Sequence, residues 1–587
     1  MNLPRLLQMS PTEISTRAQQ AFSKRWSNPP ACRLISSSST PAFPDPPPCS
    51  LEQAERLCQH RFDLLGYKDL DFGTPIDWHF DPVHHKRAPR KPWYEVPFLD
   101  FDQIGDHKII WELNRHQHLV TLAQAGFRDE IVAQWTHWQS ENPYPIGVNW
   151  ASALEVAFRA LSWLWVRHFL GDFHDDLLPA LHLHGWYVER FLSTYFSPNT
   201  HLLGEGVALF SIGLLCPQIA DAPRWQARGW KIVLQQAETQ VRPDGFHFEQ
   251  SVYYHIYARD FFAFARDLAA RNGITVPARF EQAIEKMDEA LSALTQAGRL
   301  PNFGDDDGGR VIASPRLRVS ASPALTVGGI HIMTDAQSQL FIDAGPPGAL
   351  TAGHSHADAL SIQLITNGRP VLIDPGTFCY VCPERDRFRG TAAHNTLQVD
   401  SRDQAQPNGP FAWTGMPETI VDRWHTSEFF DLFAGHHNGY HPVIHHRWVF
   451  GLKNKFWLVR DLVTESGYPL GPSGRGHRLD IHWHLLDERD LAILPPAGHT
   501  WSRSMERWDW SPVYGKKEPA FVLQFSTETF LPAEFAVLLM PVALGTFTQT
   551  APGAYRYQEL QGSHEFIFGE RFVYRATGPA GVTEFSL

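Results

Sequence analysis

Cysteine is scarce in this chain, with six residues among 587. Their scattered positions exclude a small secreted domain built on a disulfide framework, and we expect free thiols. Cys379 and Cys382 form a single CxxC pair. Without a second pair or a redox fold around it, this motif is weak evidence for zinc or thiol chemistry.

Long apolar runs and an excess of positive charge are also missing. No run reaches the roughly 20 residues of a membrane-spanning helix, and residues 1–20 lack the apolar core of a secretory signal. The 51 Lys and Arg residues face 63 Asp and Glu residues, so the net charge is -12. This balance excludes a general binder of nucleic acids or membrane surfaces. We therefore expect a soluble chain with no nucleic-acid partner and no membrane insertion.

The residues that build cores and bind metals or sugars are plentiful. Hydrophobic residues make up 43% of the chain, which is enough for two or three separately cored domains. Aromatic residues make up 13%, and a surplus of such rings can stack on sugars. The 30 histidines add the commonest metal ligand in proteins.

The chain divides into three segments with different patterns. Residues 1–50 are interpreted as a short N-terminal helix and a Pro/Ser-rich linker. Residues 51–315 repeat apolar side chains at helical spacing, which predicts an all-α domain. Residues 316–587 contain short β-type runs, which predict an antiparallel β-sandwich. The expected fold class is α+β, with the functional site in the cleft between the two large domains.

The change from helix to strand follows an acidic, Gly-rich break at residues 304–309. Beyond it, Asn367-Gly368 separates two apolar runs and is the strongest hairpin signal in the chain, because a type I′ turn needs positive φ at both central residues. Before it, no convincing strand alternation interrupts the helical pattern. We therefore expect the two secondary-structure types to be segregated along the chain.

A histidine cluster lies beside the predicted hairpin. The segment contains His354, His356 and Asp358, and Asp374 and His394 follow it. Two imidazoles and a carboxylate, from His356, Asp374 and His394, form a ligand set suited to zinc. Their long spacings are equally compatible with ordinary hydrogen-bonded histidines, and the residues alone leave both interpretations open.

Two polar segments of the helical half, residues 197–205 and 246–255, flank predicted helix starts. They contain Asn199, His201 and Tyr254. In the structural interpretation Asn199 caps a helix and Tyr254 is a half-buried aromatic residue whose hydroxyl is satisfied. Periodicity does not separate that interpretation from a catalytic one.

In combination, these residues resemble the heparinase II/III-like polysaccharide lyase family. The resemblance extends from about residue 77 to the end of the chain. It implies an incomplete α/α toroid followed by an antiparallel β-sandwich, and β-elimination on a uronic-acid-containing polysaccharide such as heparan sulfate, alginate or an exopolysaccharide. It also implies a zinc ion in the sandwich beside the cleft. The residues that carry it are His354-Ser355-His356-Ala357-Asp358, Asp374, His394-Asn395, Asn199, His201 and Tyr254-His255.

The resemblance assigns a role to each of these side chains. It makes His356, Asp374 and His394 the zinc ligands, with the metal fixing the loop geometry, since elimination consumes no water. It makes Tyr254 the catalytic tyrosine and His354 its partner acid or base, while Asn199 and His201 bind the uronate carboxylate. Many family members place the Asn and His next to each other, whereas Thr200 separates them here.

The chemistry explains why such groups are needed. Removal of the weakly acidic C5 proton requires donors that offset the carboxylate charge as an enolate-like intermediate forms. A base must take that proton and an acid must protonate the departing O4. Tyrosine, with a pKa of about 10, serves as base only beside a positive group but serves as acid unaided.

Substrate subsites require cationic and aromatic side chains along the cleft. The candidates are Asn149, Trp150, Arg159, Arg115, His116 and Arg389. The histidine-rich segments at residues 436–446 and 482–484 alternate as strand residues do, and we interpret them as a solvated sheet face rather than as ligands.

Two other functions compete with the lyase. A glycoside hydrolase would need two carboxylates roughly 5 to 10 Å apart, for which Glu249 with Asp305 or Asp306 could serve. A non-catalytic polysaccharide-binding or assembly protein could keep the same fold. The family resemblance implies the periplasm or cell envelope, and because no signal peptide is visible the cytoplasm stays open as an alternative.

Overall fold

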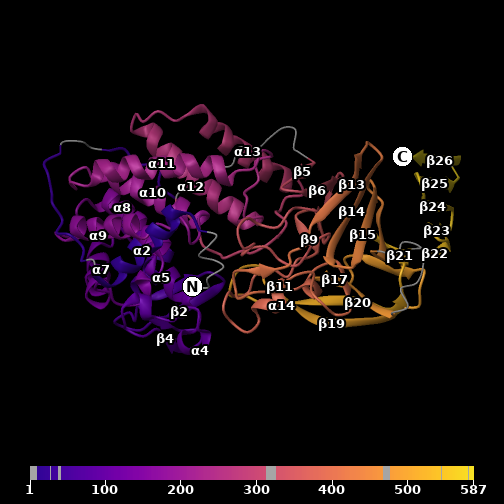
Figure 1. Cartoon of the computed structure of the whole chain (residues 1–587), viewed down its shortest axis with the longest axis horizontal. Helices are drawn as coiled ribbons and strands as arrows, with labels where there is room; N and C mark the ends of the chain where they lie inside the picture. Colours follow the sequence, from indigo (N-terminus) through magenta and orange to yellow (C-terminus); the bar gives the residue numbers. More distant parts are fainter. Residues whose placement is uncertain are drawn as a thin grey trace.

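The chain folds into a helical half followed by a half built of β-sheets (Figure 1). The computed structural model describes residues 9–26, 28–37, 41–312, 325–466, 476–543, 545–579 and 581–587. The predicted α+β fold class, with an incomplete α/α toroid before an antiparallel β domain, is confirmed. The boundary expected between residues 315 and 316 lies outside the described residues.

The helical half is built of antiparallel helices around one large core. Its α-helices are α2 (Pro11–Trp26), α3 (Leu51–Cys58), α4 (Phe101–Ile104), α5 (His107–Asn114), α6 (Gln117–Gln124), α7 (Arg128–Glu141), α8 (Ala153–Leu170), α9 (Leu177–Arg190), α10 (Thr200–Leu215), α11 (Ala222–Gln240), α12 (Val252–Arg271) and α13 (Ala278–Leu294). Short 3-10 turns, η1 (Trp93–Glu95) and η2 (Val148–Trp150), connect some of them.

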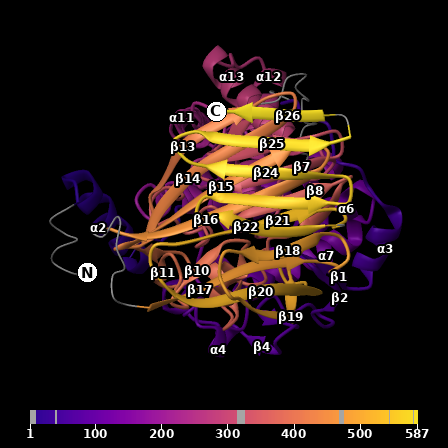
Figure 2. The ribbon, with the colours of Figure 1, turned by 90° about the vertical axis from the view of Figure 1, so that its right-hand side faces the viewer.

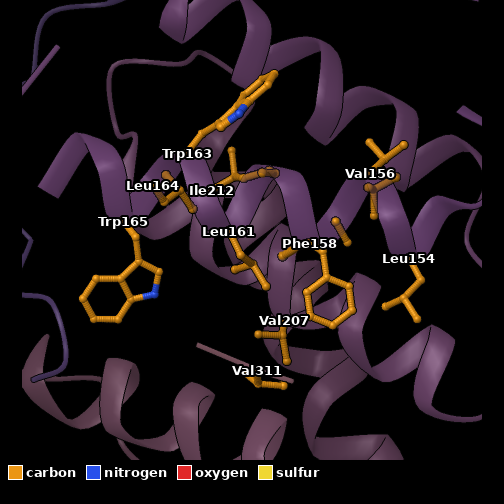
Figure 3. Packing of buried hydrophobic residues seen from close by; sticks show 14 of the residues in the cluster. Leu154, Val156, Phe158, Leu161, Trp163, Leu164, Trp165, Val207, Ile212 and Val311 are labelled. Atoms are coloured by element: carbon orange, nitrogen blue, oxygen red, sulfur yellow. The ribbon is translucent and has the colours of Figure 1, made fainter. Parts of the chain in front are cut away.

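Helices α8 and α10 form the centre of this core. Apolar side chains of α8, such as Leu161, pack with Val207 and Ile212 of α10 in a buried cluster (Figure 3). Helices α10 and α11 approach closely because both carry glycine at the crossing. A Cβ on Gly213 would lie 2.3 Å from a backbone nitrogen of α11, and one on Gly229 would lie 2.3 Å from a backbone nitrogen of α10. These glycines thus let α10 and α11 pack backbone to backbone, which fixes the position of α10.

Short strands interrupt the helical half, contrary to the prediction. Strands β1 (Arg61–Leu64) and β2 (Tyr67–Asp71) form one antiparallel pair, and β3 (Phe80–Asp81) and β4 (Lys86–Arg87) form another. They were missed because segments of two to five residues are too short to show a period-2 pattern. Among the described residues, no helix is long and apolar enough to span a bilayer.

The β half contains two facing antiparallel sheets. The nine-stranded sheet runs β19-β20-β17-β9-β8-β7-β6-β5, with β10 paired to β17, and the six-stranded sheet runs β13-β14-β15-β16-β21-β18. The strands are β5 (Thr326–Val327), β6 (Ile330–Thr334), β7 (Ser338–Asp343), β8 (Ile362–Thr366), β9 (Arg369–Leu372), β10 (Leu397–Val399), β13 (Thr419–Thr426), β14 (Phe430–Tyr440), β15 (Val443–Leu452), β16 (Phe456–Glu465), β17 (Gly476–Leu485), β18 (Ala492–Ala497), β19 (Ser502–Trp510), β20 (Glu518–Phe530) and β21 (Ala533–Met540). The predicted hairpin at Asn367-Gly368 is confirmed: it joins β8 to β9, and both turn residues have positive φ, 51° and 73°.

A third sheet extends the predicted sandwich. Strands β22 (Thr546–Ala551), β23 (Ala554–Glu559), β24 (Gly562–Phe568), β25 (Phe572–Gly578) and β26 (Gly581–Ser586) form a five-stranded meander at the C-terminal end (Figure 2). Its aromatic side chains, including Phe566 and Tyr574, pack on Phe450 and Leu538 of the six-stranded sheet. The third sheet therefore covers part of the second face of the six-stranded sheet. A short pair, β11 (Gln406–Pro407) with β12 (Trp413–Thr414), a helix α14 (Arg385–Arg389) and a 3-10 turn η3 (Thr391–Ala393) lie in the loops beside the nine-stranded sheet.

Candidate active site

The start of helix α12 places Tyr254 against residues of the β half. Ser251 caps the helix and its hydroxyl accepts the backbone N–H of Tyr254, so the tyrosine is held in the first turn. Its phenol oxygen lies 2.9 Å from that of Tyr380, and its ring stacks on the ring of His354 with centroids 3.8 Å apart. Two groups capable of proton transfer, one from each half, are thus in direct contact.

Asp305 organises the histidines of the cluster. One carboxylate oxygen lies 3.1 Å from Nδ1 of His354 and the other lies 3.1 Å from Nε2 of His356. Arg385 donates to both oxygens. Burial alone would raise the pKa of Asp305, but Arg385 and the two histidines hold it well below its ordinary value. The acidic break between the two halves therefore carries a buried carboxylate, Asp305, that links His354 to His356.

Asn199 and Glu249 form the wall beside His354. Asn199 is the N-cap of α10, where its Oδ1 accepts the backbone N–H of His201, and its Nδ2 donates to Glu249 at 2.7 Å. Glu249 also accepts the backbone N–H of Thr200 and lies 3.5 Å from Nε2 of His354. Of the two predicted carboxylate-binding residues, Asn199 thus already donates to a carboxylate of the protein itself.

These contacts join Tyr254 to His354 directly and connect Asn199 to His354 through Glu249. His201 lies beside them, close enough for its charge to be coupled to that of His354, and burial lowers the pKa of His201 to about 4. Burial, with the negative charge of Asp307 adding to it, raises the pKa of the Tyr254 phenol well above its ordinary value. Near neutral pH, Tyr254 is therefore a protonated hydroxyl and His201 a neutral imidazole.

Tyr380, which sequence analysis did not single out, lies between the two cysteines of the CxxC motif. Cys379 and Cys382 form a disulfide, so the expectation of free thiols is wrong for this pair. The four other cysteines are free. The reason is local geometry: the tight turn around Tyr380 places the two Cα atoms 5.9 Å apart, within the usual range for a disulfide.

The three predicted metal ligands lie together, and Asp358 joins them. His356, Asp358, Asp374 and His394 are all buried, and one potential ligand atom from each lies within 4.8 Å of the others. Nδ1 of His394 is 2.8 Å from Asp374. Burial alone would lower the pKa of His394, but the neighbouring carboxylate of Asp374 raises it to about 9.

A fit test for zinc rests on the unused nitrogens of this cluster. Within the described part of the chain, Nδ1 of His356 and Nε2 of His394 are buried and have no hydrogen-bond partner. Buried polar atoms are normally paired, and two such imidazole nitrogens beside two carboxylates match the N/O ligands of zinc. The contact of His356 with Asp305 supplies the usual outer carboxylate that orients a ligating imidazole. The residues fit the metal.

The six predicted substrate-binding side chains all lie in the interior. Each is at most 1% exposed: Asn149, Trp150, Arg159, Arg115, His116 and Arg389. Arg159 donates to two backbone carbonyls and to His184, and Arg115 pairs with Glu155. Their contact with substrate stays a prediction, and their buried positions add no support to it. A sequence shows the type of each residue but not the direction in which its side chain points.

A cavity of about 320 Å³ opens on the other side of the α12 N-terminus. Tyr253, Asp306, Asp374 and Trp510 line it, and the described lining residues include neither Tyr254 nor His354. Tyr254 and His354 are themselves nearly closed off from solvent, with 5% and 8% of their surface exposed. The cavity therefore adjoins Tyr254 and His354 without including them, while the predicted metal ligand Asp374 lies in its lining.

Comparison with known proteins gives matches over most of the chain. The model described as heparinase II/III N-terminus matches residues 50–313, and the model described as heparinase II/III-like, C-terminal, matches residues 318–508. The heparin-sulfate lyase of Pedobacter heparinus is 24% identical over 494 residues, covering 74% of this chain and 68% of the relative. That of Bacteroides stercoris is 22% identical over 490 residues, covering 71% and 68%.

Solved structures share the fold across the chain. A crystal structure of heparinase III superposes with a TM-score of 0.67 at 16% identity, covering 98% of this chain and 95% of the other. A heparan sulfate lyase from Pedobacter heparinus superposes with a TM-score of 0.55 at 18% identity, covering 98% and 94%.

The helical half, the antiparallel β half and these relatives define a polysaccharide lyase, which is a carbon–oxygen lyase. Because the two domain models together cover most of its length, the chain belongs to the heparinase II/III-like family.

Proposed function

We propose that this enzyme cleaves a uronate-containing polysaccharide of the heparan sulfate type by β-elimination. The observation that carries the proposal is the stacked pair of Tyr254 and His354. Glu249 lies beside His354 and accepts a hydrogen bond from Asn199, which brings the predicted carboxylate-binding amide to the same place. The relatives from Pedobacter and Bacteroides are heparin-sulfate lyases, which supports this substrate class.

The carboxylate of the uronate would bind at Asn199 and His201. A neutral imidazole and an amide donate hydrogen bonds without needing a counter-charge, and such donors stabilise the charge that develops on the carboxylate when C5 loses its proton. Glu249 now holds the amide of Asn199, so substrate would have to share or displace that contact.

Tyr254 and His354 would divide the proton transfers. Because its pKa is raised, the Tyr254 hydroxyl is suited to donate a proton to the departing O4. When Nδ1 of His354 donates to Asp305, Nε2 is left to accept the C5 proton. Tyr380 lies within hydrogen-bond distance of Tyr254 and would orient its hydroxyl.

The geometry argues against the competing glycoside hydrolase. Both oxygens of Asp305 are engaged by Arg385 and the two histidines, so neither is free to attack a sugar or to activate a water in partnership with Glu249. Because Tyr254 and His354 are nearly closed off, binding of a polymer also requires the two halves to separate locally.

As the compartment of this activity we propose the periplasm or cell envelope, as the family resemblance implies.

The direct test is ultraviolet absorbance during incubation of the full chain with heparan sulfate, heparin, alginate and chondroitin sulfate. Elimination creates an absorbing unsaturated uronate at the new non-reducing end, whereas hydrolysis creates only a reducing end. We expect absorbance to rise with heparan sulfate. Reducing ends without absorbance would replace the proposal with hydrolysis, and neither signal on any of the four polymers would contradict it.

We further propose that His356, Asp358, Asp374 and His394 hold a structural zinc ion. When bound, such a metal supplies a fixed cross-link between the loop of His354 and the strands behind it. The protein side chains carry out the remaining work: Asp305 orients His356, and Asp374 orients His394.

Removal of this metal should destabilise the enzyme. A ligand that binds only the folded state stabilises it by about 4 kcal/mol at a thousand times its Kd. We expect chelation followed by desalting to lower the melting temperature by several degrees, and added zinc to restore it. Metal content by mass spectrometry checks occupancy before and after. A melting temperature that stays constant while the protein loses all its zinc would contradict the structural role.

A further inference from the structure

A second group of histidines lies on the six-stranded sheet, outside the site described above. His436 on β14 and His446 on β15 are direct cross-strand partners, and their ring centroids are 5.1 Å apart. Nδ1 of His436 lies 2.9 Å from the carboxylate of Asp422 on β13. One potential ligand atom from each of the three lies within 4.8 Å of the others.

The sheet register produces this convergence. Neighbouring His437 and His445 point to the opposite face, where they form a buried chain to Asp461. The alternation leaves His436 and His446 on the other face, half-buried. Strand β13 is the edge strand, and a β-bulge between Val421 and Arg423 turns Asp422 toward His436.

The arrangement of the two imidazoles favours a shared metal ion over direct contact between two protonated rings. Two protonated histidines directly opposite would repel each other, whereas a shared metal uses both as neutral donors. Thr464 contacts Nε2 of His446 at 3.2 Å, and the ring of Trp448 stacks on it, so its plane is fixed.

We propose that Asp422, His436 and His446 form a second metal site, which binds a divalent transition metal of the zinc class at the protein surface. Two imidazoles and a carboxylate are the N/O donors that zinc accepts, and three protein ligands leave one position for solvent. The side chains of His436 and Asp422 are 26% and 43% exposed, which gives a metal ion access from solvent. The bound ion ties edge strand β13 to β14 and β15, across the bulge where the ladder is interrupted.

The site can be tested on the full chain without any substrate. Chelated protein is titrated with zinc chloride by calorimetry, and bound metal is counted after desalting. We expect the wild type to bind one more zinc ion per chain than His446→Ala. Asp422→Asn should weaken that ion by at least about tenfold, because even outer-shell changes cost metal sites 10- to 100-fold.

His425→Ala serves as the matched control, since it removes an imidazole from β13 outside the cluster. It should bind as many ions as the wild type. Occupancy of the buried cluster changes both counts equally, so the difference between wild type and His446→Ala reports the surface site alone. Equal melting temperatures in chelator show that the variants are folded. Equal zinc counts in wild type and His446→Ala, or an equal loss in His425→Ala, would overturn the proposal.

Discussion

Replacing Tyr254 with phenylalanine is expected to lower the rate of β-elimination by about 100- to 10 000-fold, the usual contribution of a positioned acid or base. The substitution removes one oxygen and its contact with Tyr380, while the ring remains to stack on His354. Because no charge is changed and no cavity larger than a hydroxyl is left, the melting temperature should stay nearly constant. Initial rates of ultraviolet absorbance with the best substrate measure the effect.

Tyr253→Phe provides the control for this experiment. The neighbouring tyrosine carries the same hydroxyl but lines the adjoining cavity, away from His354. Its activity should remain within a few-fold of the wild type. If Tyr254→Phe also retains wild-type activity, the proton donor must be another group, and Tyr380→Phe becomes the next variant.

Asp305→Asn is expected to have the largest effect on stability. The change leaves the buried guanidinium of Arg385 without its counter-charge, and removing one partner of a buried ion pair costs about 3 to 5 kcal/mol. It also releases His354 and His356 from the carboxylate that orients them, so elimination should be lost in the protein that still folds. Urea unfolding and the absorbance assay, made on the same preparation, measure the two effects.

The adjacent residue gives a closely matched comparison. Asp306 accepts the backbone N–H of Gly308, and burial raises its pKa to about 7, so Asp306→Asn changes little charge and keeps the acceptor. Its free energy of unfolding should remain within about 1 kcal/mol of the wild type. Equal losses in the two variants would mean that the loop tolerates no amide at all, and the special role of Asp305 would be wrong.

The order of the two halves could be predicted because each has its own period. Apolar spacing of three and four residues predicts α8 and α13, and Asn367-Gly368 predicts the turn between β8 and β9. Strand runs show where strands lie but not which sheet each one joins. The separate five-stranded sheet was therefore not distinguished from the sandwich.

The candidate site could be predicted only where the residue type itself carries chemistry. The ligand set of His356, Asp374 and His394 converges, while Asp358, two residues after His356, was seen only as part of the histidine segment. Asp305 and Tyr380 act through contacts across roughly 50 and 126 residues of chain, which no local pattern encodes. The arginine and tryptophan residues of the predicted subsites were assigned to the cleft because such side chains bind sugars. They are buried instead, because burial depends on which face of a helix each residue occupies.

The strand order also sets how far this enzyme can be shortened. The family match ends at residue 508, yet β20 lies between β19 and β17, and β21 lies between β16 and β18. A truncation at the end of the match would leave an unpaired edge inside both large sheets. Strands β22 to β26 pair only among themselves, so their removal would keep both ladders whole but uncover Phe450 and Leu538 to water. An expression fragment that ends near residue 543 would thus keep the proposed catalytic residues and acquire an exposed apolar face that favours aggregation.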